Sequence, residues 1–469
     1  MKRVRYFISA LLIAAMSMSF LACSSKKDEK STGNAKELDS DLRNEIRQNA
    51  EKSELLTGDK LENGEIKWLS DWDINPDGTG KNVPIDLAVF QERYGGSVKY
   101  YSCTYEDRYE KLTEYMSSGE GIDFFYGGNL DAFPRGAIKN MFVPADDYID
   151  FDSPLWEDVK DVNDQFLWNR KHYMAGVQAT GDTVAVVYNK KTVAEAGLED
   201  PADLYARGEW TWDTFQDMLE KFVDTDNQKY GIDGWWFEFG LMNTIGVPPV
   251  GLEDGKLVNN LSDPSMERVQ NWIYDLYQKN CIAIGVGDFG WDTKPAYIGE
   301  GKTLFYPIGL YDFYMEKDKW TAKYGEDVFF VPMPKDPEAD EYYVPTGLES
   351  YMFVSGGSNP EGVARYLDCK RFVHLDPKTK EIADQQFKDD YGWTQEMLDM
   401  KDSMQELAED NPTIDISRGV SQDCGNLLND SLRLTARGTP WNETYESINA
   451  TVDKYLEKIN SDPDPADVD

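Results

Sequence analysis

Residues 65–128 decide the fold, and they contain in order EIKWLS (65–70), IDLAVFQERYGG (85–96), SVKYYSCTY (97–105), YEDRYEKLTEYMSSG (105–119) and IDFFYGG (122–128). The first, third and last segments are typical of strands. The second predicts a helix, because Leu87, Phe90 and Tyr94 recur at helical spacing before a glycine pair that ends it. The fourth is an amphipathic helix. An order of strand, helix, strand, helix, strand predicts an α/β unit.

A second set of patterns follows. We predict strands over 183–191, 303–309, 327–334 and 347–356, and helices over 210–224, 266–280 and 442–460. Residues 191–205 predict a short helix closed by turn residues. Helices predominate after Pro360. About 400 residues exceed what one hydrophobic core usually serves, so two lobes are expected.

The N-terminus has the pattern of an export signal. Lys2, Arg3 and Arg5 precede an apolar run that is too short to span a bilayer comfortably. The end of this run, FLAC before Ser24, resembles a bacterial lipoprotein box, in which Cys23 would carry the lipid; an ordinary signal with a cysteine nearby is the alternative. Residues 1–22 are therefore the expected signal, and residues 23–60 a polar tether that turns into a spacer helix with Leu38, Leu42 and Ile46 on one stripe. Whether this spacer docks on the body stays open.

The composition excludes some partners. The 86 acidic and 48 basic residues give a formal charge of −38, which repels nucleic acid and anionic lipid headgroups.

Cys103, Cys281, Cys369 and Cys424 form no CxxC pair, and the chain has only two histidines, so neither a metal site nor a cofactor is expected. These cysteines could be free thiols or form one or two disulfides.

The loop WLSDWDINPDGTGKNVP, residues 68–84, admits three interpretations. A calcium loop starting at Asp73 would need a bidentate Glu at its twelfth position, where Pro84 stands, and it has Lys81 at the ninth. A catalytic pair of Asp71 and Asp73 has no support beyond the abundance of acidic residues. The remaining interpretation is a turn after a strand whose Trp72 could stack on a sugar ring.

Several blocks resemble, in order, the sugar-type extracellular solute-binding proteins of bacterial ABC importers. These blocks are EIKWLSDW, the segment from FQERYGG to IDFFYGG, FVPADDYID, VVYNKKTVAEAGLEDP with GEWTWDTF, IGEGKTLFYPIGLYDFY, and VPMPKDPEADEYYVPTGLESYMFVSGGSNPEGVARYL. The resemblance implies an α/β, two-lobe, periplasmic-binding-protein-like (type II) fold with discontinuous lobes and an interlobe cleft. Residues 64–180 and 335–375 would form lobe 1, residues 185–330 and 376–460 lobe 2, and residues 461–469 a disordered acidic tail.

A neutral sugar requires flat aromatic rings against its apolar faces and polar side chains around its hydroxyls. Loops at the ends of the predicted strands supply such residues. The candidate ligand-binding residues are Ser70, Trp72, Asp73, Asn129, Asp131, Trp235, Trp236, Tyr311 and Glu349. Trp68, Trp210 and Trp212 are expected to be structural.

The sequence therefore predicts a lipid-anchored receptor on the outer face of the cell membrane. It would be a monomer and not an enzyme, and it would deliver an oligosaccharide or another solute to ABC permease subunits. An exported glycan-cleaving enzyme and a binding module that reports to a membrane sensor are the alternatives.

Overall fold

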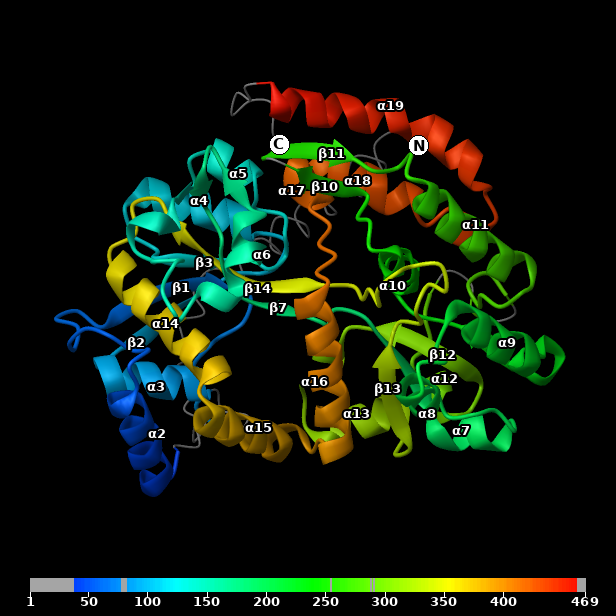
Figure 1. Cartoon of the computed structure of the whole chain (residues 1–469), viewed down its shortest axis with the longest axis horizontal. Coiled ribbons are helices and arrows are strands. Elements are labelled where there is room, and N and C mark those ends of the chain that lie inside the picture. Colours follow the sequence, from blue (N-terminus) through cyan, green and yellow to red (C-terminus); the bar gives the residue numbers. More distant parts are fainter. Residues whose placement is uncertain (1–37, 77–81, 254, 287–288, 290–291, 462–469) are drawn as a thin grey trace, which may run out of the picture.

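A computed structural model describes residues 38–76, 82–253, 255–286, 289 and 292–461, and within them the two larger β-sheets lie side by side (Figure 1). The predicted export signal, Cys23 and the acidic tail beyond Ser461 lie outside the described residues, as do Asp77, Gly78 and Lys81 of the loop after the first strand. No helix in the described part of the chain is long and apolar enough to cross a membrane.

The first sheet has the strand order β2-β1-β3-β14-β4, and β7 also pairs with β14. Its strands are β1 (Glu65–Ser70), β2 (Ser97–Ser102), β3 (Phe124–Tyr126), β4 (Phe142–Val143), β7 (Ala175–Thr180) and β14 (Gly347–Val354). β1 runs parallel to β2 and β3, while β14 is antiparallel to β3. Helices α3 (Ile85–Tyr94) and α4 (Arg108–Ser118) connect the three parallel strands, so the predicted alternation is confirmed.

Helix α3 shows how the sequence sets a boundary. Leu87, Phe90 and Tyr94 are fully buried, as their spacing predicts. The helix ends at Gly95, which has a left-handed φ of 71° and donates its N–H back to the last turn. Glycine takes this conformation without a steric cost, so the helix ends there and β2 can begin beside β1.

The second sheet has the order β13-β8-β12-β9, and its strands are almost wholly buried. The strands are β8 (Ala185–Asn189), β9 (Tyr230–Ile232), β12 (Thr303–Ile308) and β13 (Val328–Pro332). The surrounding helices are α7 (Lys190–Glu195), α8 (Pro201–Ala206), α9 (Trp212–Phe222), α10 (Phe237–Met242), α11 (Pro264–Gln278), α12 (Ala296–Gly299) and α13 (Lys317–Tyr324). The short helix predicted within 191–205 is α7, which ends before Gly197, with φ 67°; the capping residue Asp200 then begins a second helix, α8, which was not predicted.

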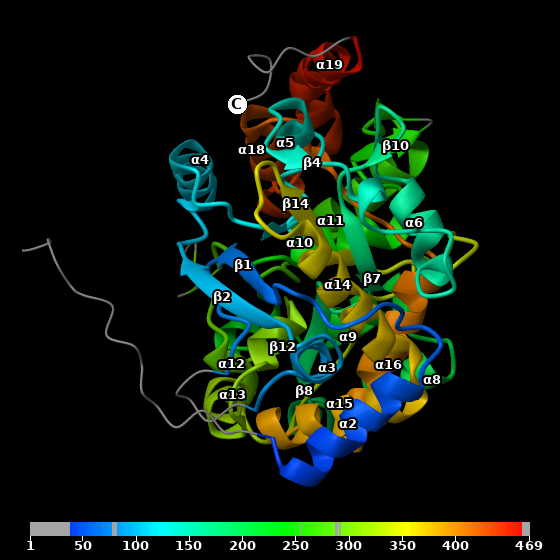
Figure 2. The same cartoon turned by 90° about the vertical axis from the view of Figure 1, so that its left-hand side faces the viewer.

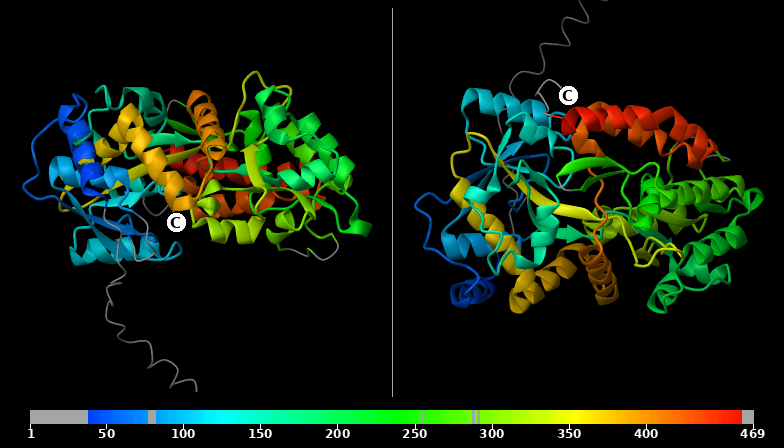
Figure 3. Two further views of the ribbon diagram at one scale, coloured as in Figure 1. Left: turned by 90° about the horizontal axis from the view of Figure 1, so that it is seen from below. Right: turned by 45° about the horizontal axis from the view of Figure 1, so that its top comes forward.

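The chain crosses between the sheets after β7 and again after β13, so β14 returns to the first sheet. The helices that follow are α14 (Pro360–Leu375), α15 (Pro377–Tyr391), α16 (Gln395–Asp410), α17 (Ser417–Val420), α18 (Gln422–Ser431) and α19 (Trp441–Asn460). Helix α19 packs on α11, α18 and β11 of the hairpin β10 (Val250–Glu253) and β11 (Lys256–Asn259), across one end of the molecule (Figure 3).

Two of these helices contact both halves of the molecule, that is, the elements around the first sheet and those around the second sheet. Helix α15 packs on α14 and α3, while its Phe387 and Tyr391 contact Tyr314 from the second half. Helix α16 packs on both β7 and β13. A lobe boundary at residue 376 therefore does not coincide with a break in contacts, and the lobe limits stay predictions.

The predicted spacer helix exists as α2 (Ser40–Lys52), and it docks on the body. Ile46 and Ala50 are fully buried against α3, and the Arg43 guanidinium lies 3.0 Å from the Glu92 carboxylate. Figure 2 shows α2 beside α15 and beneath α3. From Leu38 onward the spacer is thus part of the folded body.

The four cysteines in the described part of the chain are free thiols, which settles that alternative. Cys281, Cys369 and Cys424 are buried and Cys103 is half-buried. Burial raises the pKa of the Cys281 and Cys424 thiols to about 12, so these thiols are unreactive.

Candidate functional site

A cleft of about 820 Å³ lies between the two sheets. Its walls come from the loops after β1 and β3, the crossover Thr180–Val184, the start of β14, α14 and the loop before α17. The carboxyl ends of parallel strands β1 and β3 both open into it, which is the usual position of ligands in open α/β sheets. The two chain crossovers, after β7 and before β14, also line the cleft.

Aromatic rings line both walls. Trp72 is anchored by its backbone, because the Trp68 indole N–H donates to its carbonyl at 3.0 Å. Its ring stands edge-on to Tyr126, with the ring centroids 4.9 Å apart, and 40% of the residue is exposed. From the second half come Trp236, Phe239 and Tyr311, of which Tyr311 is 57% exposed. Rings held in this way present flat apolar faces to whatever enters.

Polar groups lie between the rings. Among the described residues, five carboxylates line the cleft: Asp73, Asp86, Asp182, Glu349 and Asp415. The side chains of Asn75, Asn82, Asn129, Asn243 and Asn429 line it too. Asp182, in the first crossover, accepts a hydrogen bond from the Tyr314 hydroxyl at 2.5 Å. Carboxylates, amides and hydroxyls of this kind can accept from and donate to ligand hydroxyls.

Two cations line the cleft in the described residues, Lys370 and Arg418. The Lys370 ammonium lies 2.5 Å from Asp86 and 2.9 Å from Glu349. The Arg418 guanidinium lies 5.5 Å from the ring centroid of Trp236, within cation–π range. Burial alone would raise the pKa of Glu349, but Lys370 and His374 outweigh it and hold that pKa well below its usual range.

The structure brings six of the nine predicted residues to the cleft: Trp72, Asp73, Asn129, Trp236, Tyr311 and Glu349. Asp73 accepts from the backbone N–H of Asn75 at 2.9 Å, as the turn interpretation of this loop predicts. Whether these six side chains contact a ligand stays a prediction.

The other three candidates do not line the cleft, which corrects the positions expected for them. Ser70 is the last residue of β1 and is buried. Asp131 is buried in an ion pair with Arg108 and accepts from the Tyr109 hydroxyl at 2.7 Å, so it fixes the loop after β3. Trp235 is half exposed beside the cleft, while its neighbour Trp236 lines it.

Sequence reasoning missed Asp86, Asp182, Tyr126 and Lys370 as lining residues. Tyr126 precedes the glycine pair that closes a predicted strand, and Asp182 lies just before another predicted strand, so both could have been found as strand-end residues. Asp86 and Lys370 lie within helices, where nothing in the local pattern indicates that they face a cleft.

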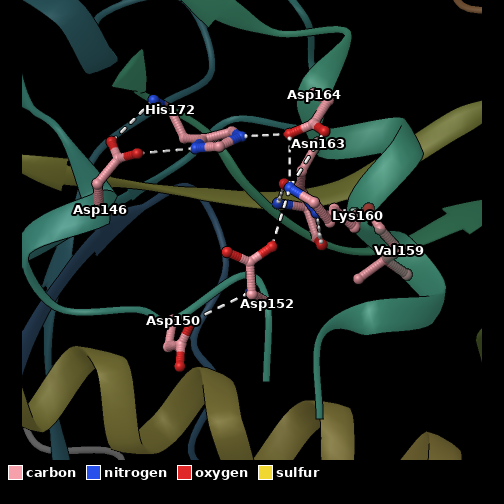
Figure 4. A network of polar contacts seen from close by, with 9 residues as sticks. Asp146, Asp150, Asp152, Val159, Lys160, Asn163, Asp164 and His172 are labelled. Atoms are coloured by element: carbon pink, nitrogen blue, oxygen red, sulfur yellow. Dashed lines mark hydrogen bonds and ion pairs between the residues drawn. The ribbon is translucent and has the colours of Figure 1, made fainter. Parts of the chain in front are cut away.

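A second group of charged side chains lies outside the cleft (Figure 4). The His172 ring contacts Asp146 through Nδ1 and Asp164 through Nε2, both at 2.9 Å, and Lys160 lies 3.3 Å from Asp152 and 3.2 Å from Asp164. Its groups are paired with one another and hold η1 (Ala145–Asp147), α6 (Lys160–Asp164) and β6 (Lys171–His172) together. In the described residues no group of three or more His, Cys, Asp or Glu side chains could hold a metal ion.

Comparison with known proteins identifies relatives. The family model described as bacterial extracellular solute-binding protein matches residues 72–369, more than half of the chain. The maltotriose-binding protein of Pyrococcus abyssi is 29% identical over 167 residues, and this match spans 33% of each protein.

Two solved structures have the same fold. The cyclic alpha-maltosyl-1,6-maltose binding protein of Arthrobacter globiformis has a TM-score of 0.60 at 15% identity, covering 84% of this chain and 100% of that one. A cyclo/maltodextrin-binding protein complexed with maltotetraose has a TM-score of 0.59 at 18% identity, covering 87% and 100%. The predicted α/β, two-lobe, type II fold is thereby confirmed.

Proposed function

Because the chain belongs to the bacterial extracellular solute-binding proteins, we propose that its cleft captures a neutral oligosaccharide and that the loaded protein delivers it to an ABC permease. The observation that carries this proposal is the pairing of exposed rings with carboxylates and amides on both walls of one cleft. Rings stack on the apolar faces of sugars, and ionised acceptors make strong bonds to hydroxyls.

The size and charge of the cleft support this ligand class. A volume of about 820 Å³ lies in the upper part of the usual range for small-molecule sites, roughly 300–1,000 Å³, which favours a short oligosaccharide over a single sugar. Five carboxylates face two cations, and one of these cations is shared by Asp86 and Glu349. A ligand that carries carboxylate or sulfate groups would meet a negative potential, so anionic glycans should be rejected.

Delivery of the glycan to the permease would depend on closure of the two lobes over it. Ligand contacts from both lobes favour the closed state, and only that difference in contacts can shift the equilibrium. Trp72 and Glu349 would bind from the first lobe, and Trp236 and Tyr311 from the second. The closed form is the one that permease subunits would recognise.

The test is a thermal-shift screen of a broad glycan panel on the chain without residues 1–23, followed by calorimetry on the hits. We expect neutral oligosaccharides to raise the melting temperature and to remain uncleaved. Binding of peptides or polyamines with no response to any glycan would contradict the ligand class. Product release from a labelled glycan would support the enzyme alternative instead.

We also propose that Cys23 carries a lipid that anchors the protein to the outer face of the membrane. In this arrangement, the segment from Ser24 to Glu37 separates the anchor from the docked segment that starts at Leu38. The full-length chain should partition into detergent with the membrane fraction, and Cys23→Ser should move it to the aqueous phase. An unchanged partition would contradict the anchor.

A further inference from the structure

Lys370 occupies an unusual position for a lysine. It lies on α14 with only 13% of its side chain exposed, between Asp86 at the start of α3 and Glu349 on β14. Its contacts at 2.5 and 2.9 Å join three elements that are far apart in sequence. An ammonium group withdrawn from water to this extent needs paired acceptors, and the two carboxylates provide them.

The surrounding hydroxyls complete the pairing of these carboxylates. Tyr366 donates to Asp86 at 3.1 Å, and Tyr351 donates to the same Glu349 oxygen that Lys370 contacts, at 2.9 Å. The other Glu349 oxygen faces His374 at 3.8 Å. That second oxygen has the weaker partner and is the one better placed to accept from a ligand.

The same cluster supports the aromatic wall. The Tyr351 ring contacts Tyr126 at a centroid distance of 5.8 Å, and Tyr126 contacts Trp72 at 4.9 Å. The acceptor and the ring that would stack on a sugar are therefore connected through two packed tyrosines.

We infer that Lys370 is a positioning residue, which keeps Glu349 ionised and fixed in the cleft wall so that its carboxylate accepts a hydrogen bond from a sugar hydroxyl. This inference rests on the proposed function. Without the ammonium, the carboxylate of Glu349 would be half-buried beside that of Asp86, and both burial and the neighbouring negative charge would favour the protonated form of Glu349. Lys370 prevents this by sharing its charge between them.

Other titratable groups also face the cluster, and they must be considered in any pH profile. They are Tyr126 from β3, Tyr351 from β14, Tyr366 and His374 from α14, and, from across the cleft, Asp182 and Tyr314. Burial raises the pKa of Tyr126, Tyr314, Tyr351 and Tyr366, so these phenols stay protonated between pH 5 and 8. His374 and Asp182 are kept in every variant below, and because His374 lies 3.8 Å from Glu349, a variant without the Glu349 carboxylate is needed to assign the pH dependence.

The experiment measures the dissociation constant by calorimetry at pH 5, 6, 7 and 8, with the neutral glycan that binds the wild type most tightly. For Lys370→Met we expect at least tenfold weaker binding than the wild type at pH 5, and a ratio of the two constants that decreases as the pH rises to 8. Lys370→Arg, which keeps the charge, should keep the wild-type pH profile. Lys160→Met removes the lysine of the second charged cluster and should change neither affinity nor profile.

A double variant tests whether the Glu349 carboxylate causes the pH dependence. Adding Glu349→Gln to Lys370→Met should abolish the extra pH dependence, because the titrating carboxylate is gone. If Lys370→Met does not fold, the charge-balanced pair Asp86→Asn with Lys370→Met replaces it. A smaller decrease of the ratio with pH is then expected, because burial still favours protonated Glu349 but the neighbouring carboxylate is gone.

The inference is overturned if Lys370→Met, or the charge-balanced pair that replaces it, keeps the wild-type profile, or if the pH dependence survives Glu349→Gln. These outcomes differ from a failure of the proposed function, in which the wild type itself binds no glycan and both proposals are overturned.

Discussion

The two charged clusters around the first sheet are built alike but face different surroundings. In one, Lys370 lies between Asp86 and Glu349 in the wall of the cleft. In the other, His172 lies between Asp146 and Asp164, away from the cleft (Figure 4). The same chemistry therefore has two uses. The His172 cluster joins η1, α6 and β6, whereas the Lys370 cluster also lines the cleft.

Neutralising one carboxylate in each cluster should give the largest difference. Glu349→Gln keeps the shape but removes an ionised acceptor, and a hydrogen bond to a charged group contributes about 1.5–3 kcal/mol, so the dissociation constant should rise about 10- to 100-fold. Asp164→Asn, the matched change, should leave it unchanged. Calorimetry with the best neutral glycan measures both, and equal effects would remove the distinction between the clusters.

A smaller effect is expected from the exposed rings. Trp72 and Tyr148 are equally exposed, at 40% and 41%, but Tyr148 stacks on Phe353 outside the cleft. Trp72→Ala should weaken glycan binding about tenfold through lost stacking, with little change in melting temperature, while Tyr148→Ala should not affect binding. An unchanged affinity in Trp72→Ala would show that this tryptophan is structural and does not stack on the ligand.

The smallest effect is on acid stability, and here the clusters should behave alike. Lys370 and His374 outweigh burial and hold the pKa of Glu349 well below its usual range, and hydrogen bonds from His172 and Lys160 outweigh burial to lower the pKa of Asp164. A carboxyl whose pKa is lowered by folding stabilises the protein above its unfolded pKa, about 4, and that stability is lost as the pH falls further.

The melting temperature of the wild type should therefore fall between about pH 5 and pH 3. In Glu349→Gln or Asp164→Asn this fall should be about 1–3 °C smaller than in the wild type. Differential scanning fluorimetry across this range measures the change. A drop of the same size in all three proteins would show that neither carboxyl contributes.

The sequence predicted the fold better than the site, for reasons visible in single residues. Periodicity located β1, α3 and β3, and hence the strand ends where Trp72 and Asn129 emerge. It could not distinguish Trp235 from Trp236, because adjacent loop residues give no indication of which side chain turns inward. Nor could it foresee that Asp131 pairs with Arg108, a contact between residues that only the folded loop brings together.

Cleft-lining residues within helices were harder to predict than those in loops at strand ends. Lys370 belongs to a helix with both polar and apolar residues, and a lysine there is expected on the solvent side. Its burial depends on Asp86 and Glu349, which come from a helix and a strand elsewhere in the chain. The same limit applied to the spacer, since the stripe of Leu38, Leu42 and Ile46 predicted the helix but not the surface of α3 on which it docks.

We propose that the cleft binds a neutral oligosaccharide and rejects an anionic one. The decisive experiment is calorimetric titration of the wild type with the best neutral glycan, and with the same glycan after oxidation of its primary hydroxyls to carboxylates. We expect the oxidised glycan to bind at least tenfold more weakly. Equal or tighter binding of the oxidised glycan, or the absence of binding by any glycan, would contradict this selectivity.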